Sequence, residues 1–108
     1  MSRAWFCRAL TFGEALKHKN LLVVDVRTLE EVVAGGTCTG SLHVPVSNIP
    51  GAVAEFGNDK SRPIVFYCKK GIRAASAAQM LAQLGYTNAF SATDGPSVAK
   101  LLNRQSSS

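Results

Sequence analysis

A cysteine stands among basic residues in the segment Phe66-Tyr67-Cys68-Lys69-Lys70-Gly71-Ile72-Arg73. It follows an apolar run and precedes a helical pattern, which places it at the carboxyl end of a strand, where open α/β sheets bind ligands. Amides of a loop that curls back over the sulfur, and the positive end of the next helix, would stabilise an anion there. Because Lys69, Lys70 and Arg73 add positive charge, we expect the thiol pKa to fall below its ordinary value of about 8.5.

A free cysteine at the end of a strand is more often a small buried hydrophobic residue than a nucleophile. The surroundings of Cys68 favour the second interpretation, because an inert cysteine gains nothing from three neighbouring cations. Gly71 fits the same interpretation, since a tight turn around an anion often needs a positive φ or a bare backbone. The sequence therefore predicts a reactive thiolate at position 68.

The elements that must position this cysteine are two mainly apolar runs, residues 21–26 and 64–68, typical of strands covered on both faces. Shorter strands are predicted at residues 41–44 and 88–91. Helical segments are predicted at residues 29–34, 51–56, 72–84 and 95–102, and a capping box at residues 11–14 predicts one more. Strands that alternate with helices indicate an α/β domain with a mainly parallel sheet.

Length and composition indicate a single domain. The chain has 108 residues, of which 46% are hydrophobic and 18% charged, as in ordinary globular domains. We expect the domain to span residues 1–102 and a polar, flexible tail to follow at residues 103–108. No stretch is long and apolar enough to cross a bilayer, and no secretory signal is recognised, so a cytoplasmic location and no membrane partner are expected.

The net charge of +5 does not by itself indicate a nucleic-acid partner. Lys69, Lys70 and Arg73 supply three of these charges, so the excess is concentrated around one cysteine, and no basic face interleaved with aromatic residues is evident. The three cysteines show no CxxC spacing, and His18 and His43 have no partners at metal-ligand spacing. We expect no metal, no cofactor and no nucleic acid.

Several segments, in order, resemble the rhodanese family of sulfurtransferases. Residues 22–27 (Leu-Val-Val-Asp-Val-Arg), followed by Glu31, resemble its Asp-x-Arg signature. Residues 40–45 (Gly-Ser-Leu-His-Val-Pro) resemble its Gly-Ala-x-Asn/His-Ile-Pro segment, and residues 67–74 resemble its active-site loop. Leu84-Gly85-Tyr86 and Asp94-Gly95 also match, so the resemblance covers roughly residues 9–102.

The resemblance implies a single rhodanese domain with a mainly parallel five-stranded sheet and helices on both faces. The implied activity is transfer of a sulfane sulfur from thiosulfate or a persulfide to a thiophilic acceptor such as cyanide or a thiol, through a persulfide on catalytic Cys68. Lys70 matches a position that binds thiosulfate, and Arg73 closes the loop. The residues expected to bind substrate are Lys69, Lys70, Gly71, Ile72 and Arg73.

Two alternatives to this enzyme stay open. One is a sulfur carrier or regulatory module that exchanges sulfur with a protein partner and uses thiosulfate poorly. The other is a phosphatase or arsenate reductase on the same fold. Related phosphatases have five residues between cysteine and arginine, whereas four separate Cys68 from Arg73 here. The shorter loop favours a single sulfur atom over a phosphate group.

The sequence departs from the family pattern in residues 34–41, which lack the usual His-x-Pro and are one residue longer. Such a change could alter the rim of the pocket and the choice of partner. In the family, Asp25, Arg27 and Glu31 would form a structural ion pair that fixes the turn after the first strand. Cys38 could resolve the persulfide but is more often incidental, and the same holds more strongly for Cys7.

Overall fold

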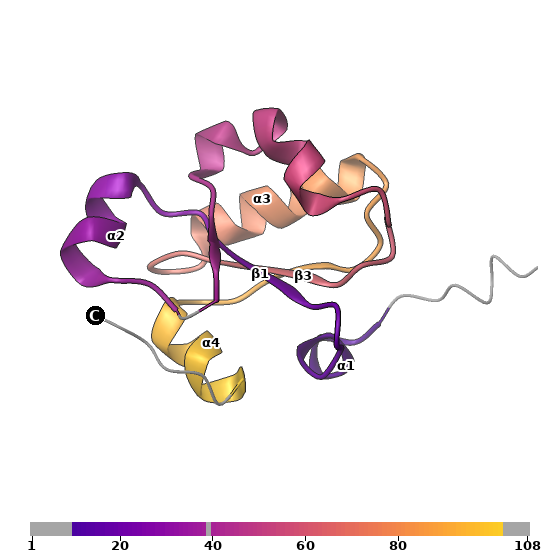
Figure 1. The fold of residues 1–108 in the computed structure, drawn as a ribbon, viewed down its shortest axis with the longest axis horizontal. Coiled ribbons are helices and arrows are strands. Elements are labelled where there is room, and N and C mark those ends of the chain that lie inside the picture. Colours follow the sequence, from indigo (N-terminus) through magenta and orange to yellow (C-terminus); the bar gives the residue numbers. More distant parts are fainter. Residues whose placement is uncertain (1–9, 39, 103–108) are drawn as a thin grey trace, which may run out of the picture.

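The computed structural model describes residues 10–38 and 40–102 and shows strands alternating with helices (Figure 1). The strands are β1 (Leu22–Asp25), β2 (Leu42–His43), β3 (Ile64–Tyr67) and β4 (Ala89–Ser91). The helices are α1 (Phe12–Leu16), α2 (Leu29–Gly35), α3 (Ile72–Gln83) and α4 (Gly95–Leu102), with 3-10 turns η2 (Val46–Asn48) and η3 (Pro50–Phe56). In the part of the chain that the structure describes, no helix has the length and apolarity to span a bilayer.

The sheet has the strand order β2-β1-β3-β4, and every pair is parallel. The prediction of a parallel α/β sheet is confirmed, but the expected fifth strand is wrong for the described residues, which form four. Between β2 and β3, the chain forms 3-10 turns after Pro45 and from Pro50 onward, because proline fixes φ and donates no ladder hydrogen bond.

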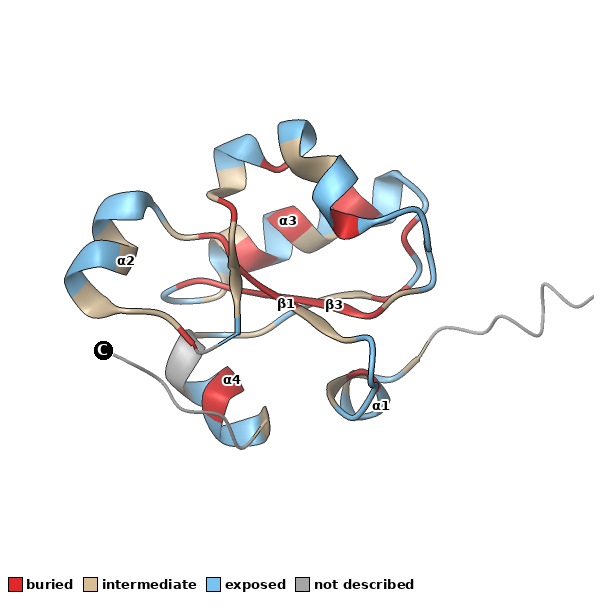
Figure 2. Cartoon of the chain, viewed as in Figure 1, coloured by how far each residue is buried: buried red, intermediate tan, exposed pale blue. Residues whose placement is uncertain are grey.

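Helices cover both faces of the sheet, as predicted (Figures 1 and 2). Side chains alternate along each strand, so the paired Val24 and Phe66 belong to the core that includes α3, η2 and η3. Val23 and Val65, one residue earlier on each strand, pack instead with residues of α1 and α4. All four side chains are 0–1% exposed, and burying each contributes about 1.5–3 kcal/mol. The two central strands are thereby fixed in register.

Helix α3 is held against the sheet by a narrow stripe of small and apolar residues. Ala74, Ala77 and Leu81 are each 0% exposed and recur at helical spacing. The helix ends before Gly85, whose φ of +98° lets the Tyr86 amide donate to the Leu81 carbonyl at 3.0 Å. This packing fixes the amino end of α3 beside the carboxyl end of β3, where Cys68 lies.

Candidate active site

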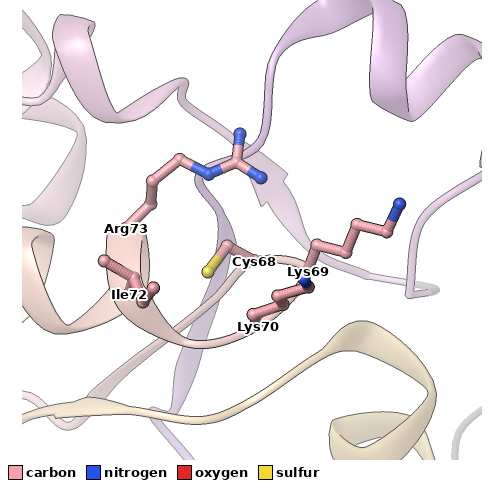
Figure 3. Close-up of a pocket in the computed structure, with 5 residues that line it drawn as sticks. All are labelled: Cys68, Lys69, Lys70, Ile72 and Arg73. Carbon is pink, nitrogen blue, oxygen red and sulfur yellow. The ribbon is translucent and has the colours of Figure 1, made fainter.

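Cys68 follows β3 directly, and the next residues curl around its sulfur (Figure 3). The residue is 1% exposed. The Gly71 amide donates to Sγ of Cys68 at 3.0 Å. Gly71 has φ +94°, a conformation that an L side chain rarely adopts. The positive φ that the sequence suggested for this turn is therefore confirmed, and it brings the amide onto the sulfur.

The amino end of α3 supplies further donors. Gly71 is the N-cap residue of this helix, and no side chain caps it. The first amides of a helix have no partner within the helix, so here they are available to an anion. Burial raises the pKa of the Cys68 thiol, but hydrogen bonds from the amides of Ala74, Lys70, Gly71 and Arg73 outweigh it. The net result is a pKa below the ordinary value of a thiol, in the direction that the sequence predicted.

The lowered pKa predicts how Cys68 reacts with iodoacetamide as the pH changes. Only the thiolate is alkylated, so the rate should rise with pH and level off at a lower pH than in urea-unfolded protein. The measurement uses a Cys7→Ser background and locates the modified residue by peptide mass. Cys38 packs with Val23 and Val98 in an apolar core, whereas Cys68 lines an open hollow, so Cys38 should stay unmodified in the native state. A native midpoint equal to or above the unfolded one would contradict the amide cradle.

The basic side chains predicted around the cysteine are brought together by the structure. Lys69 and Lys70 are exposed, and Arg73 is half-buried. Ile72 is 75% exposed and adds an apolar lip. A hollow of about 410 Å³ lies over the sulfur, and it is lined by Cys68, Lys69, Lys70, Ile72 and Arg73 (Figure 3).

Arg73 makes a bidentate ion pair with Glu31 of α2. Its Nη1 and Nη2 donate to the two carboxylate oxygens of Glu31 at 2.5 and 3.0 Å. The hydrogen bond from Arg73 is the largest cause that lowers the pKa of Glu31 to about 2. Glu31 was expected in an ion pair with Asp25 and Arg27, but its ion-pair partner is Arg73. It still fixes the turn after β1, because it accepts from the Thr28 amide at 2.9 Å in a capping box. Its carboxylate fixes the arginine that closes the cysteine loop.

Asp25 and Arg27 form the other ion pair, as predicted. Nε and Nη2 of Arg27 donate to the fully buried Asp25 carboxylate at 2.8–3.2 Å, and Nη2 also donates to the Gly36 carbonyl. Burial raises the pKa of Asp25, but hydrogen bonds from Arg27 and Thr37 outweigh it and hold the carboxylate ionised. His43 Nε2 contacts the Arg27 carbonyl oxygen at 2.8 Å. These contacts fix the turn between β1 and α2.

Tyr67 is a functional neighbour that the sequence analysis missed. Its hydroxyl lies 2.6 Å from Oγ1 of Thr37 and 3.3 Å from Oγ of Ser41, and it accepts from the Cys38 amide at 2.9 Å. This single hydroxyl ties Thr37, Cys38 and Ser41 to β3, which ends directly before Cys68. Nothing in the sequence reveals such a link, because Tyr67 reads only as part of an apolar run.

Cys38 does not share a core with the candidate nucleophile. It packs with Val23 and Val98 on the face of the sheet that α1 and α4 cover, whereas Cys68 packs in the core of α3. This separation argues against Cys38 as a resolving thiol for Cys68. Cys7 lies outside the described residues.

Comparison with protein families gives a match over most of the chain. The model of a family described as "Rhodanese-like domain" matches residues 9–97. A human protein named thiosulfate:glutathione sulfurtransferase is 36% identical over 77 residues, which is 60% of this chain and 66% of the relative. A protein of Allochromatium vinosum named sulfurtransferase is 37% identical over 68 residues, 63% of this chain and 61% of the relative. The chain thus spans just under two thirds of each relative.

Solved structures show the same fold. A structure described as a human single-domain sulfurtransferase superposes with a TM-score of 0.61 at 32% identity, and the match covers 68% of this chain and 75% of the other. A rhodanese-like domain from Anabaena superposes with a TM-score of 0.65 at 19% identity and covers 82% of this chain and 99% of the other. The second likeness supports the fold alone.

Proposed function

The chain belongs to the rhodanese-like domain family, and we propose that it is a sulfurtransferase that carries sulfane sulfur as a persulfide on Cys68. The observation that carries this proposal is the amide cradle, in which the Gly71 amide lies 3.0 Å from Sγ and the pKa of the thiol is lowered. The names of the two sulfurtransferase relatives support it. The proposed domain is residues 1–102, acting in the cytoplasm, where thiols stay reduced.

In the first half of the reaction, the Cys68 thiolate attacks the outer sulfur of thiosulfate. A bond forms between Sγ and that sulfur, the sulfur–sulfur bond of thiosulfate breaks, and its electron pair leaves with sulfite. The product is an anionic persulfide, and no proton needs to move. Lys70 and Arg73, which line the hollow over the sulfur, attract the doubly charged donor and stabilise the charge as it shifts.

In the second half, an acceptor such as cyanide or a thiolate attacks the terminal sulfur of the persulfide. A bond forms to the acceptor, the bond to Sγ breaks, and the electron pair returns to Cys68 as the thiolate. The cysteine therefore splits one transfer into two displacements, which is covalent catalysis with ping-pong kinetics. The cradle amides stabilise the negative charge at both stages.

Two activity measurements distinguish sulfur transfer from phosphatase activity. We expect thiocyanate to form from thiosulfate and cyanide with ping-pong kinetics, and no hydrolysis of an aryl phosphate above background. The four-residue loop between Cys68 and Arg73 supports this outcome, because a tetrahedral phosphate needs a wider cradle. Aryl phosphate hydrolysis that depends on Cys68, without thiocyanate formation, would overturn the proposal. Sulfur loading only from a protein donor would favour the carrier alternative.

A further inference from the structure

A second hollow opens beside the one over Cys68, and Lys69 lines both. It has a volume of about 330 Å³. Figure 3 shows the Lys69 side chain leading away from the Cys68 sulfur. The residues that line it are Arg27, Glu31, Ala34, Gly35 and Lys69.

The charges around this second hollow leave one cation without a partner. The Arg27 guanidinium is paired with the buried carboxylate of Asp25. The carboxylate of Glu31 is occupied by Arg73 through both of its oxygens. Lys69 is exposed and makes no ion pair among residues 10–38 and 40–102. The hollow therefore favours an anion, even though one of its lining residues is a glutamate.

Arg27 offers a second donor to the same space. Its Nε and Nη2 are used by Asp25 and the Gly36 carbonyl, but Nη1 donates to no acceptor in the described ranges. The side chain is 16% exposed, and it lines the second hollow. A Cβ on Gly35 would lie 3.9 Å from Nη1, so the glycine leaves the approach to the guanidinium open. A carboxylate at this place would gain a charge-assisted hydrogen bond.

We propose that this second hollow binds the carboxylate of an acidic thiol acceptor, an amino-acid or short-peptide thiol, between Lys69 and Arg27. The inference rests on the proposed function and names the class of acceptor for the second half of that reaction. The bound acceptor's thiolate attacks the terminal persulfide sulfur, and the electron pair of the broken bond returns to Cys68. The hollow is larger than a carboxylate, so it also accommodates the backbone of such a thiol.

Lys69 is assigned to the acceptor because it links the two hollows. Thiosulfate must place its outer sulfur against Cys68, and its sulfonate then stays within the first hollow near Lys70 and Arg73. A longer acceptor that delivers its thiol to the same sulfur must leave by an open side. On the side of Lys69, the first hollow adjoins the second one, where the Lys69 ammonium makes no ion pair among the described residues. Loss of Lys69 should therefore affect an acidic acceptor more than a neutral one.

The first test compares N-acetylcysteine with its amide, which differ in the carboxylate. Persulfide-loaded protein is mixed with each thiol, and loss of the persulfide is followed to give kcat/KM. We expect Lys69→Ala to lower the ratio of kcat/KM for the acid to kcat/KM for the amide about five-fold, the scale of an exposed charge pair. Ala34→Glu should lower this ratio similarly, because it adds a negative charge at an exposed helix position. Lys69→Arg should preserve the ratio, and so should Lys100→Ala on α4. An unchanged ratio in Lys69→Ala, or equal losses with both thiols, would overturn the inference.

The second test separates this inference from the proposed function, because it needs no sulfur transfer. The protein is titrated with S-methyl-N-acetylcysteine or its amide, neither of which has a free thiol, and backbone amide shifts are recorded by NMR. We expect the acid to shift Gly35 and Lys69, the amide to shift neither, and the response to disappear in Lys69→Ala. Binding of the acid by a protein that forms no persulfide would reject the proposed sulfurtransferase function and retain the second hollow as an anion site. Persulfide chemistry without this binding would reject the acidic-thiol site alone.

Discussion

Replacing Cys68 with serine is expected to lower thiocyanate formation from thiosulfate and cyanide by roughly a thousand-fold or more, the scale on which nucleophile removal acts in covalent catalysis. A serine hydroxyl is not ionised near neutral pH, so the amide cradle has no anion to stabilise and no persulfide forms. The measurement is the steady-state rate of thiocyanate production at saturating donor.

Cys38→Ser is the matched control for this substitution. Both cysteines are almost completely buried, but they lie in cores on opposite faces of the sheet. Cys38→Ser should lower the thermal stability, because a hydroxyl replaces a thiol in an apolar core, while folded protein keeps its transfer rate. Equal loss of activity in both variants, or retained activity in Cys68→Ser, would contradict the assignment of the nucleophile.

Replacing Gly71 with alanine is expected to lower the transfer rate about a hundred-fold, comparable with loss of one donor that stabilises a developing anion. The loss comes from backbone strain and not from a steric clash, since a Cβ at Gly71 would lie 3.7 Å from atoms of Ala92 and Thr93, an ordinary contact distance. The φ of +94° costs an alanine about 1–2 kcal/mol. Relief of that strain turns the Gly71 amide away from the sulfur, which raises the pKa of Cys68.

Gly85→Ala separates this effect from general destabilisation. Gly85 has almost the same φ, +98°, and a Cβ there meets nothing within 4 Å. It lies at the other end of α3, so the variant should lose similar stability and keep both the transfer rate and the pH dependence of Cys68 alkylation. If both variants slow transfer equally, the amide of Gly71 has no special role.

Local sequence patterns were enough to place the cysteine and its cradle. The two apolar runs became β1 and β3, paired in parallel register, and the helical stripe after Cys68 became α3. Each of these predictions depends on neighbouring residues: a mainly apolar run, a small-residue stripe, and glycines at positive φ. The capping box at Thr11 and Glu14 was likewise readable and is confirmed.

Contacts between residues far apart in the sequence could not be predicted from local patterns. The pairing of Arg73 with Glu31 joins residues 42 positions apart, and no rule of sequence matches the two arginines of the site with its two acids. One signal was overlooked, the Thr-x-x-Glu pattern of Thr28 and Glu31, which the structure shows as a capping box. It fixes where Glu31 points but not which cation it meets.

The hydroxyl of Tyr67 and the second hollow arise only from the folded chain. Tyr67 looks like one more apolar strand residue, yet its hydroxyl gathers Thr37, Ser41 and the Cys38 amide. The open approach to Arg27 likewise depends on Gly35, whose spacing from Arg27 in the sequence predicts no contact. Long-range side-chain geometry of this kind needs the tertiary structure.

The most direct test of the central claim is the mass of the protein after incubation with thiosulfate. The account predicts a gain of one sulfur atom, located on the peptide that contains Cys68, removed by cyanide or a thiol, and absent in Cys68→Ser. An unmodified mass after thiosulfate and persulfide donors, or a sulfur atom located on another cysteine, would contradict it.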